Sequence, residues 1–150
     1  MAQPLKTVSI NRNAKGAGMK TFTFMTTDEE FISLIKLIAS FSLETGTPFW
    51  KNVGEVTGSF QTAGAATLLV KDEGDIIGYV HSYLISSNEM MISQAYNRNG
   101  GEDNLVAFDA LEKAARERGI VKLLALVYLD PKVFEKYGLK FERYLLTKRI

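Results

Sequence analysis

The order of apolar and polar residues predicts a strand and then a helix in the first third of the chain. Thr21–Met25 alternates polar with apolar residues, as a half-buried strand does. Thr27 and Glu30 have the spacing of a capping box, which marks a helix start. The helix is predicted to bury the apolar positions that follow at helical spacing, Phe31, Leu34, Ile35 and Ile38. Between Ser42 and Gly64, glycine and proline interrupt the pattern, so no long element is predicted there.

Three apolar runs in the middle of the chain predict a meander of antiparallel strands. Short polar turns separate these runs, which are Ala66–Lys71, Ile76–Ser86 and Met90–Tyr96. A helix is predicted from Asp103 or Asn104 to Arg118, with Gly119 as its left-handed C-terminal cap. Val121–Val127 is nearly all apolar, which predicts a strand that is buried on both faces and reached through a helical crossover.

The two ends of the chain carry different patterns. Residues 1–19 are polar and glycine-bearing, which predicts a flexible or loosely attached arm, although Val8 and Ile10 can add a short edge strand. Near the other end, Pro131 fits the first turn of a short helix, and Phe141–Ile150 predicts a last strand.

A single domain over residues 20–150 accounts for all of these elements. Their order is strand, one or two helices, three antiparallel strands, helix, strand, helix and strand. We therefore expect an α/β (α+β) fold with a mixed, mostly antiparallel central sheet and flanking helices.

Composition narrows the classes of function. The chain has 150 residues, a net charge of +1, one histidine and no cysteine. This balance argues against nucleic acid as the main partner, and it leaves little material for a zinc site or a histidine-containing nucleophile triad. No secretory signal is recognisable at the start, and no apolar run reaches the roughly 20 residues of a membrane span. We expect a cytoplasmic protein without a membrane partner or a metal.

Two segments resemble motifs of the GNAT-type acyl-CoA N-acyltransferases, whose order of elements the chain also resembles over residues 20–150. Arg98–Asp103 resembles that family's phosphate-binding turn, (Arg/Gln)-x-x-Gly-x-(Gly/Ala), with Arg98 and Gly101 in register. Pro131–Phe141 is similar to the family's short helix of the form Tyr-Glu-Lys-x-Gly-Phe. In such a turn, glycine and the amides of a helix N-terminus form an anion site.

The resemblance implies an acyl-CoA-dependent N-acyltransferase, most simply an acetyltransferase that uses acetyl-CoA and a primary amine. It implies that the pantetheine arm lies beside a splayed strand, where a backbone N–H near Gln94 polarises the thioester carbonyl. The acceptor amine is of unknown class. The residues implied in binding coenzyme A are Ser93, Gln94, Ala95, Arg98, Asn99, Gly100, Gly101, Glu102, Asp103 and Phe134.

The chain departs from the family pattern at both motifs. Asp103 stands where the family has glycine or alanine, and it either faces the pyrophosphate or turns outward as a helix N-cap. Glu102 adds a second negative charge. Phe134 stands where the family often has the tyrosine that protonates the departing thiolate, which leaves Tyr128 and Tyr137 as candidate acids.

The base that deprotonates the amine has two candidates, His81 and Glu89, and a water chain is an alternative. For the tyrosines and for His81, ordinary packing is the simpler interpretation. An alternative function is a non-catalytic binding or assembly module that keeps the fold. A homodimer is possible through the edge of the predicted strand Phe141–Ile150.

Overall fold

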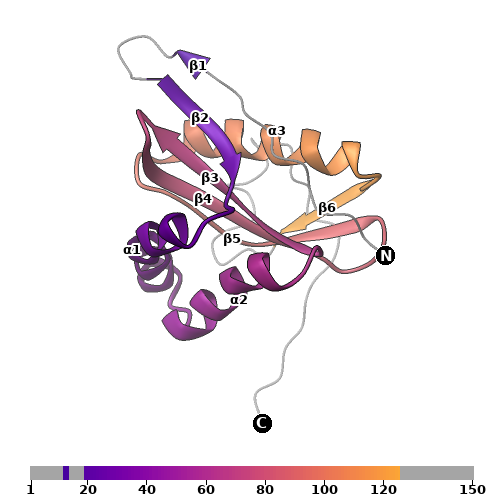
Figure 1. The fold of residues 1–150 in the computed structure, drawn as a ribbon, viewed down its shortest axis with the longest axis horizontal. Coiled ribbons are helices and arrows are strands. Elements are labelled where there is room, and N and C mark those ends of the chain that lie inside the picture. Colours follow the sequence, from indigo (N-terminus) through magenta and orange to yellow (C-terminus); the bar gives the residue numbers. More distant parts are fainter. Residues whose placement is uncertain (1–11, 14–18, 126–150) are drawn as a thin grey trace.

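The computed structural model describes residues 12–13 and 19–125, and the side chains of residues 12, 13, 19 and 101–105 lie outside this description. A six-stranded sheet runs through the described part in the order β1-β2-β3-β4-β5-β6 (Figure 1). Neighbouring strands pair antiparallel except β5 and β6, which pair in parallel. The strands are β1 Arg12–Asn13, β2 Met19–Phe24, β3 Ala65–Asp72, β4 Asp75–Leu84, β5 Glu89–Asn97 and β6 Lys122–Ala125.

Three helices cover the sheet from its two faces. Helix α1 spans Asp28–Thr45 and α2 spans Phe49–Gln61, and both pack on one face. Helix α3 spans Gly101–Glu117, packs on the other face and provides the crossover from β5 to β6 (Figure 1). The mixed, mostly antiparallel sheet that the sequence predicts is confirmed.

The N-terminus of α1 has the predicted capping box. The Thr27 hydroxyl accepts a hydrogen bond from the Glu30 N–H, and the Glu30 carboxylate accepts one from the Thr27 N–H. The same carboxylate lies 2.7 Å from Nζ of Lys71, on β3. Glu30 therefore fixes the start of α1 and joins it to the sheet.

The prediction that no long element lies between Ser42 and Gly64 is wrong. Helix α1 continues to Thr45 and is capped by Gly46 in the left-handed region, and α2 then forms within the glycine-bearing stretch. Two glycines in α2 lower its intrinsic helix propensity, so contacts with the rest of the protein stabilise it. The buried residues Asn52 and Val56 make such contacts.

The core divides into two clusters, one on each face of the sheet. The face toward α3 is apolar and uses alanine from the helix, which lets the helix lie close to the strands. Its cluster includes Phe22, Leu68, Val70, Val80, Met90, Ala107, Ala110, Leu111 and Ala114. The face toward α1 and α2 includes Leu34, Ile38, Phe41, Val56, Leu69 and Tyr79.

Helix α3 begins earlier than predicted and ends as predicted. It starts at Gly101 after Gly100, which makes no side-chain cap, so Asp103 is the third helical residue and not the N-cap. At the other end, Gly119 has a φ of 92°, and the N–H groups of Gly119 and Ile120 bond to carbonyls of the last turn, a Schellman motif. The early start places two glycines and two carboxylate residues at the beginning of the helix.

The described part of β6 is half-buried, and not buried on both faces as predicted. The short strand β1 pairs with β2 at Lys20 and Met19, whereas Val8 and Ile10 lie outside the described residues. The predicted short helix from Pro131 and the strand Phe141–Ile150 also lie outside them. Over the described residues, no helix is both long and apolar enough to cross a membrane.

Candidate functional site

A β-bulge in β5 changes which side chains face α2. His81 of β4 pairs with Gln94 and Ser82 pairs with Ile92, so Ser93 is an extra residue on β5. A strand normally places every second side chain on one face, and a bulge shifts that alternation by one residue. Met90 and Ile92 therefore pack on the α3 face, whereas Gln94 contacts α2 on the opposite face.

The bulge lies just beyond the last described pair between β5 and β6. The parallel pairing runs from Glu89 with Lys122 to Ile92 with Ala125, and Ser93 is the next residue on β5. The Ser93 side chain is 3% exposed, and its hydroxyl oxygen is buried without a hydrogen-bond partner. Since buried hydroxyl groups normally have partners, this oxygen is an unsatisfied polar group at the bulge.

Gln94 is the centre of a buried polar chain that joins the sheet to α2. Its side-chain oxygen accepts a hydrogen bond from the Tyr79 hydroxyl at 2.8 Å, and its Nε2 donates to the Asn52 carbonyl at 3.0 Å. The Asn52 amide donates to the hydroxyls of Ser42 and Thr47, both at 2.8 Å. This chain of hydrogen bonds fixes the position of α2 over Gln94, the residue that follows the bulge.

His81 belongs to a second polar chain on the same face. Its Nδ1 lies 2.8 Å from the Thr67 hydroxyl, which lies 2.8 Å from the Ser59 hydroxyl of α2. Burial lowers the pKa of His81 to about 4, so the imidazole is neutral at pH 7. The candidate base is thus 1% exposed and bonded to Thr67, beside Gln94 in the register of β4 and β5.

The backbone amides of the turn between β5 and α3 bond within the protein, and the Gly100 N–H donates to the Asn97 carbonyl at 3.2 Å. The Arg98 N–H donates to the Ile77 carbonyl, and the Asn99 N–H donates to the Asn97 side chain at 2.8 Å. Gly100 has a φ of 86°, a conformation that side-chain-bearing residues seldom adopt. The first N–H groups of α3 have no carbonyl partner within the helix and point back toward this turn. Arg98, Asn99 and Gly100 are all exposed, so an anion can reach these groups.

Gly78 allows β4 to lie close to the start of this turn. A Cβ atom at residue 78 would lie 2.8 Å from the Tyr96 backbone carbonyl oxygen and 2.8 Å from Nδ2 of the Asn97 side chain. Because the carbonyl belongs to the backbone, any larger residue requires β5 to move. Gly78 thereby helps to set the position of the turn and of the α3 N-terminus.

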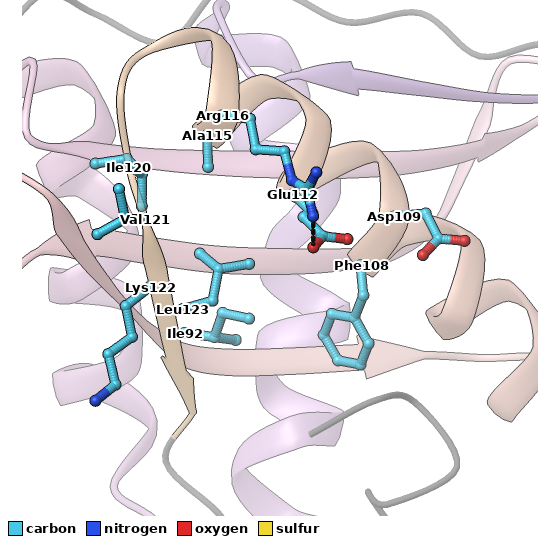
Figure 2. A pocket seen from close by; sticks show the side chains of 10 residues that line it. All are labelled: Ile92, Phe108, Asp109, Glu112, Ala115, Arg116, Ile120, Val121, Lys122 and Leu123. Atoms are coloured by element: carbon cyan, nitrogen blue, oxygen red, sulfur yellow. Dashed lines mark hydrogen bonds and ion pairs between the residues drawn. The ribbon is translucent and has the colours of Figure 1, made fainter. Parts of the chain in front are cut away.

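A pocket opens on the α3 side of the bulge. It has a volume of about 510 Å³ and reaches Ile92, the residue before Ser93. Figure 2 shows apolar side chains from β5, β6 and α3 together with the Glu112–Arg116 ion pair, whose atoms are 2.9 Å apart. The lining residues are Ile92, Phe108, Asp109, Glu112, Ala115, Arg116, Ile120, Val121, Lys122 and Leu123.

The predicted coenzyme A residues of β5 and the following turn form one continuous stretch of chain that leads into α3. Ser93, Gln94 and Ala95 lie at the bulge, and Arg98 to Gly101 lead into α3. Glu89 lies at the opposite end of β5, where its carboxylate accepts a hydrogen bond from the Ser86 hydroxyl at 3.2 Å. Tyr128, Tyr137 and Phe134 lie outside the described residues, as do the side chains of Glu102 and Asp103.

The partners of Gln94 and His81 in the two polar chains were not predicted from the sequence, Asn52 and Tyr79 among them, and neither was Gly78. Asn52 had a detectable signal, because it lies among Phe49, Val53 and Val56 at helical spacing and a polar residue in such a stripe is buried. Among the described residues no group of three or more histidine, cysteine or acidic side chains is arranged to hold a metal ion.

Solved structures with a similar fold were found, although no protein-family model and no curated protein matches the sequence. An aminoglycoside N-acetyltransferase, AAC(6')-Iy, in complex with CoA has a TM-score of 0.69 and 13% identity, covering 93% of this chain and 99% of its own. A ribosomal-protein-alanine N-acetyltransferase from Brucella melitensis biovar Abortus 2308 has a TM-score of 0.65 and 16% identity. The match covers 87% of this chain and 99% of that enzyme. A predicted acetyltransferase with acetyl-CoA from Clostridium acetobutylicum has a TM-score of 0.67 and 15% identity. The match covers 87% of this chain and 96% of that protein.

At these identities the likeness concerns the fold, and function depends on the site. The order of elements, the parallel β5–β6 pair and the helical crossover between them agree with the fold that the sequence motifs implied. The protein therefore has the fold of the GNAT-type N-acetyltransferases.

Proposed function

We propose that this protein transfers an acyl group, most simply acetyl, from coenzyme A to a primary amine. The observation that carries the proposal is the arrangement along β5, where a bulge at Ser93 and the N-terminus of α3 lie at the two ends of one short segment. An extended acyl-CoA fits this arrangement, with its thioester at the bulge and its pyrophosphate at the helix.

The pyrophosphate would bind at the turn from Arg98 to the first turn of α3. Backbone N–H groups at a helix N-terminus attract anions, and glycine lets a phosphate approach the backbone closely. Because α3 begins at Gly101, the N–H of Asp103 belongs to this first turn. The exposed Arg98 side chain adds one positive charge to a segment that also contains the two acidic residues Glu102 and Asp103.

The reaction we propose is direct attack. The neutral amine nitrogen attacks the thioester carbonyl carbon, and the C–N bond forms as the C–S bond breaks. The nitrogen loses a proton to the base, and the thiolate takes up a proton from the acid. A backbone N–H near Gln94 would stabilise the oxyanion, a contribution of about 3 kcal/mol in well-studied cases. His81 is a candidate base next to Gln94, whereas Glu89 is at the far end of the strand. The candidate acids are Tyr128 and Tyr137.

Isothermal titration with acetyl-CoA tests the cofactor site. We expect micromolar binding to the unmodified protein and a loss of binding in Gly101→Glu, because the new carboxylate would occupy the proposed phosphate site. Gly54→Glu is the charge-matched control, since a Cβ at this exposed position of α2 meets no atom within 4 Å. Equal weakening by both substitutions would contradict the proposed site.

The rival function is a non-catalytic module that retains the GNAT fold. The acidic residues Glu102 and Asp103 favour it, because carboxylates next to a pyrophosphate are repulsive. No binding of the unmodified protein at millimolar acetyl-CoA would overturn the enzyme proposal in favour of this module. Aminoglycosides and an alanine of a ribosomal protein are the acceptors that the names of two structural neighbours suggest for a first screen. A homodimer and a cytoplasmic location complete the proposal.

A further inference from the structure

Glu55 lies on the side of α2 that faces the sheet, one helical turn after Asn52. Residues three apart on a helix are neighbours, so the Glu55 side chain lies next to the residue that bonds to Gln94. The side chain is partly buried, and its Oε1 is fully buried without a hydrogen-bond partner. A buried carboxylate oxygen without a partner costs free energy, so this arrangement calls for an explanation.

The effect of Glu55 on two tyrosines shows where its charge lies. Burial, followed by the negative charge of Glu55, raises the pKa of Tyr83. The same two causes, with burial again the larger, raise the pKa of Tyr79, whose hydroxyl donates to Gln94. These effects agree with the position of Glu55 three residues after Asn52, on the side of α2 that faces β4.

No described cation neutralises Glu55. The contrast is Glu30, another partly buried carboxylate, which has Lys71 at 2.7 Å and two backbone N–H donors. Each buried polar group without a partner calls for an explanation, and a bound ligand is one of them. The missing partner here is a cation, on the same side of the sheet as Gln94.

We propose that Glu55 binds the positively charged amine of the acceptor. The inference rests on the proposed acyl transfer and identifies a cationic amine as the acceptor class. The ammonium group would donate hydrogen bonds to the Glu55 carboxylate and bring the nitrogen to the α2 side of the bulge, where it gives up a proton to the base before it attacks the thioester. Glu55 is thus a specificity-determining residue for the acceptor, and we expect coenzyme A not to contact it.

The main test compares Glu55→Gln with Glu44→Gln, which removes the same charge from an exposed position of α1. The probes are putrescine, neamine and a peptide with an N-terminal alanine, with 1,4-butanediol as the uncharged counterpart of putrescine. Thiol release from acetyl-CoA is measured with the amine that reacts fastest. We expect Glu55→Gln to raise KM for this amine about 10- to 100-fold with little change in kcat, because hydrogen bonds to charged groups have this strength. Glu44→Gln should change neither KM nor kcat. Glu55→Asp should give a KM between those of the unmodified protein and of Glu55→Gln.

A second measurement needs no turnover. Removal of an unpaired buried charge should raise the melting temperature of Glu55→Gln by about 2–4 °C, whereas Glu44→Gln should leave it unchanged. A reactive amine should raise the melting temperature of the unmodified protein but not that of Glu55→Gln, and butanediol should have no effect. A lower melting temperature in Glu55→Gln, or an unchanged KM, would overturn the inference.

Failure of the proposed function gives a different result. Acetyl-CoA should bind equally to the unmodified protein and to Glu55→Gln. If acetyl-CoA binds neither, the acyl-transfer proposal fails, while the amine-dependent change in melting temperature still tests Glu55. If none of the three amines releases thiol or raises the melting temperature, the inference about Glu55 is wrong.

Discussion

The two faces of the sheet hold their helices by different means. Helix α3 packs through a buried apolar cluster rich in alanine, whereas α2 is also joined to the sheet by two chains of buried hydrogen bonds. Apolar contacts are non-directional, but hydrogen bonds require particular distances and angles. The comparison suggests that the α3 face supplies stability and that the α2 face fixes positions around the bulge.

The largest expected effect is on the α3 face, at Leu111. This side chain is fully buried against the sheet, so Leu111→Ala should lower the free energy of unfolding by about 2–5 kcal/mol. Urea denaturation measures the change, and Leu43→Ala, at a position that is 87% exposed, is the control. A loss no larger than that of the control would mean that α3 does not hold the sheet in this way.

An intermediate effect is expected on the α2 face, at Gln94. Gln94→Ala removes the acceptor of the Tyr79 hydroxyl and the donor to Asn52, so we expect a loss of about 1–3 kcal/mol in unfolding free energy. Tyr79→Phe removes the hydroxyl that Gln94→Ala leaves without an acceptor. The double variant should therefore lose less unfolding free energy than the sum of the two single variants. Strict additivity in urea denaturation would show that the polar chain does not act as a unit.

The smallest expected effect is at Glu30, and it depends on pH. Partial burial acts to raise the pKa of Glu30, but hydrogen bonds from Lys71 and the N–H groups of Thr26 and Thr27 outweigh it and lower the pKa to about 2 from 4.5. A lowered pKa contributes stability above about 4.5 that is lost as the pH falls toward 2. Glu30→Gln should therefore cost about 1 kcal/mol at neutral pH, and this difference should shrink in acid. A difference in unfolding free energy that is constant over this range would contradict the assignment.

Local signals explain which parts of the fold the sequence predicts well. The capping box at Thr27, the turns of the meander and the cap at Gly119 depend on a few neighbouring residues, and all three are present. Helix α2 was missed because Gly54 and Gly58 argue against a helix, while its stabilising partners lie on distant strands.

The candidate site divides in the same way. The glycine turn before α3 was predicted because its chemistry belongs to the backbone of consecutive residues. The bulge has only a weak signal in the sequence. The spacing of apolar residues changes from two residues between Met90 and Ile92 to three residues between Ile92 and Ala95. The polar chain through Asn52 and the unpaired Glu55 depend on the packing of α2, which the residue pattern did not predict.

The connections between strands also imply an order of folding. The pairs β3–β4 and β4–β5 are joined by short turns, whereas α1 and α2 intervene between β2 and β3, and α3 intervenes between β5 and β6. Closing a longer loop costs more entropy, so the two central hairpins should form first and β6 should dock only after α3. The edge of β5 that borders the bulge would then stay uncovered until late in folding, when a chaperone or a ligand could still reach it.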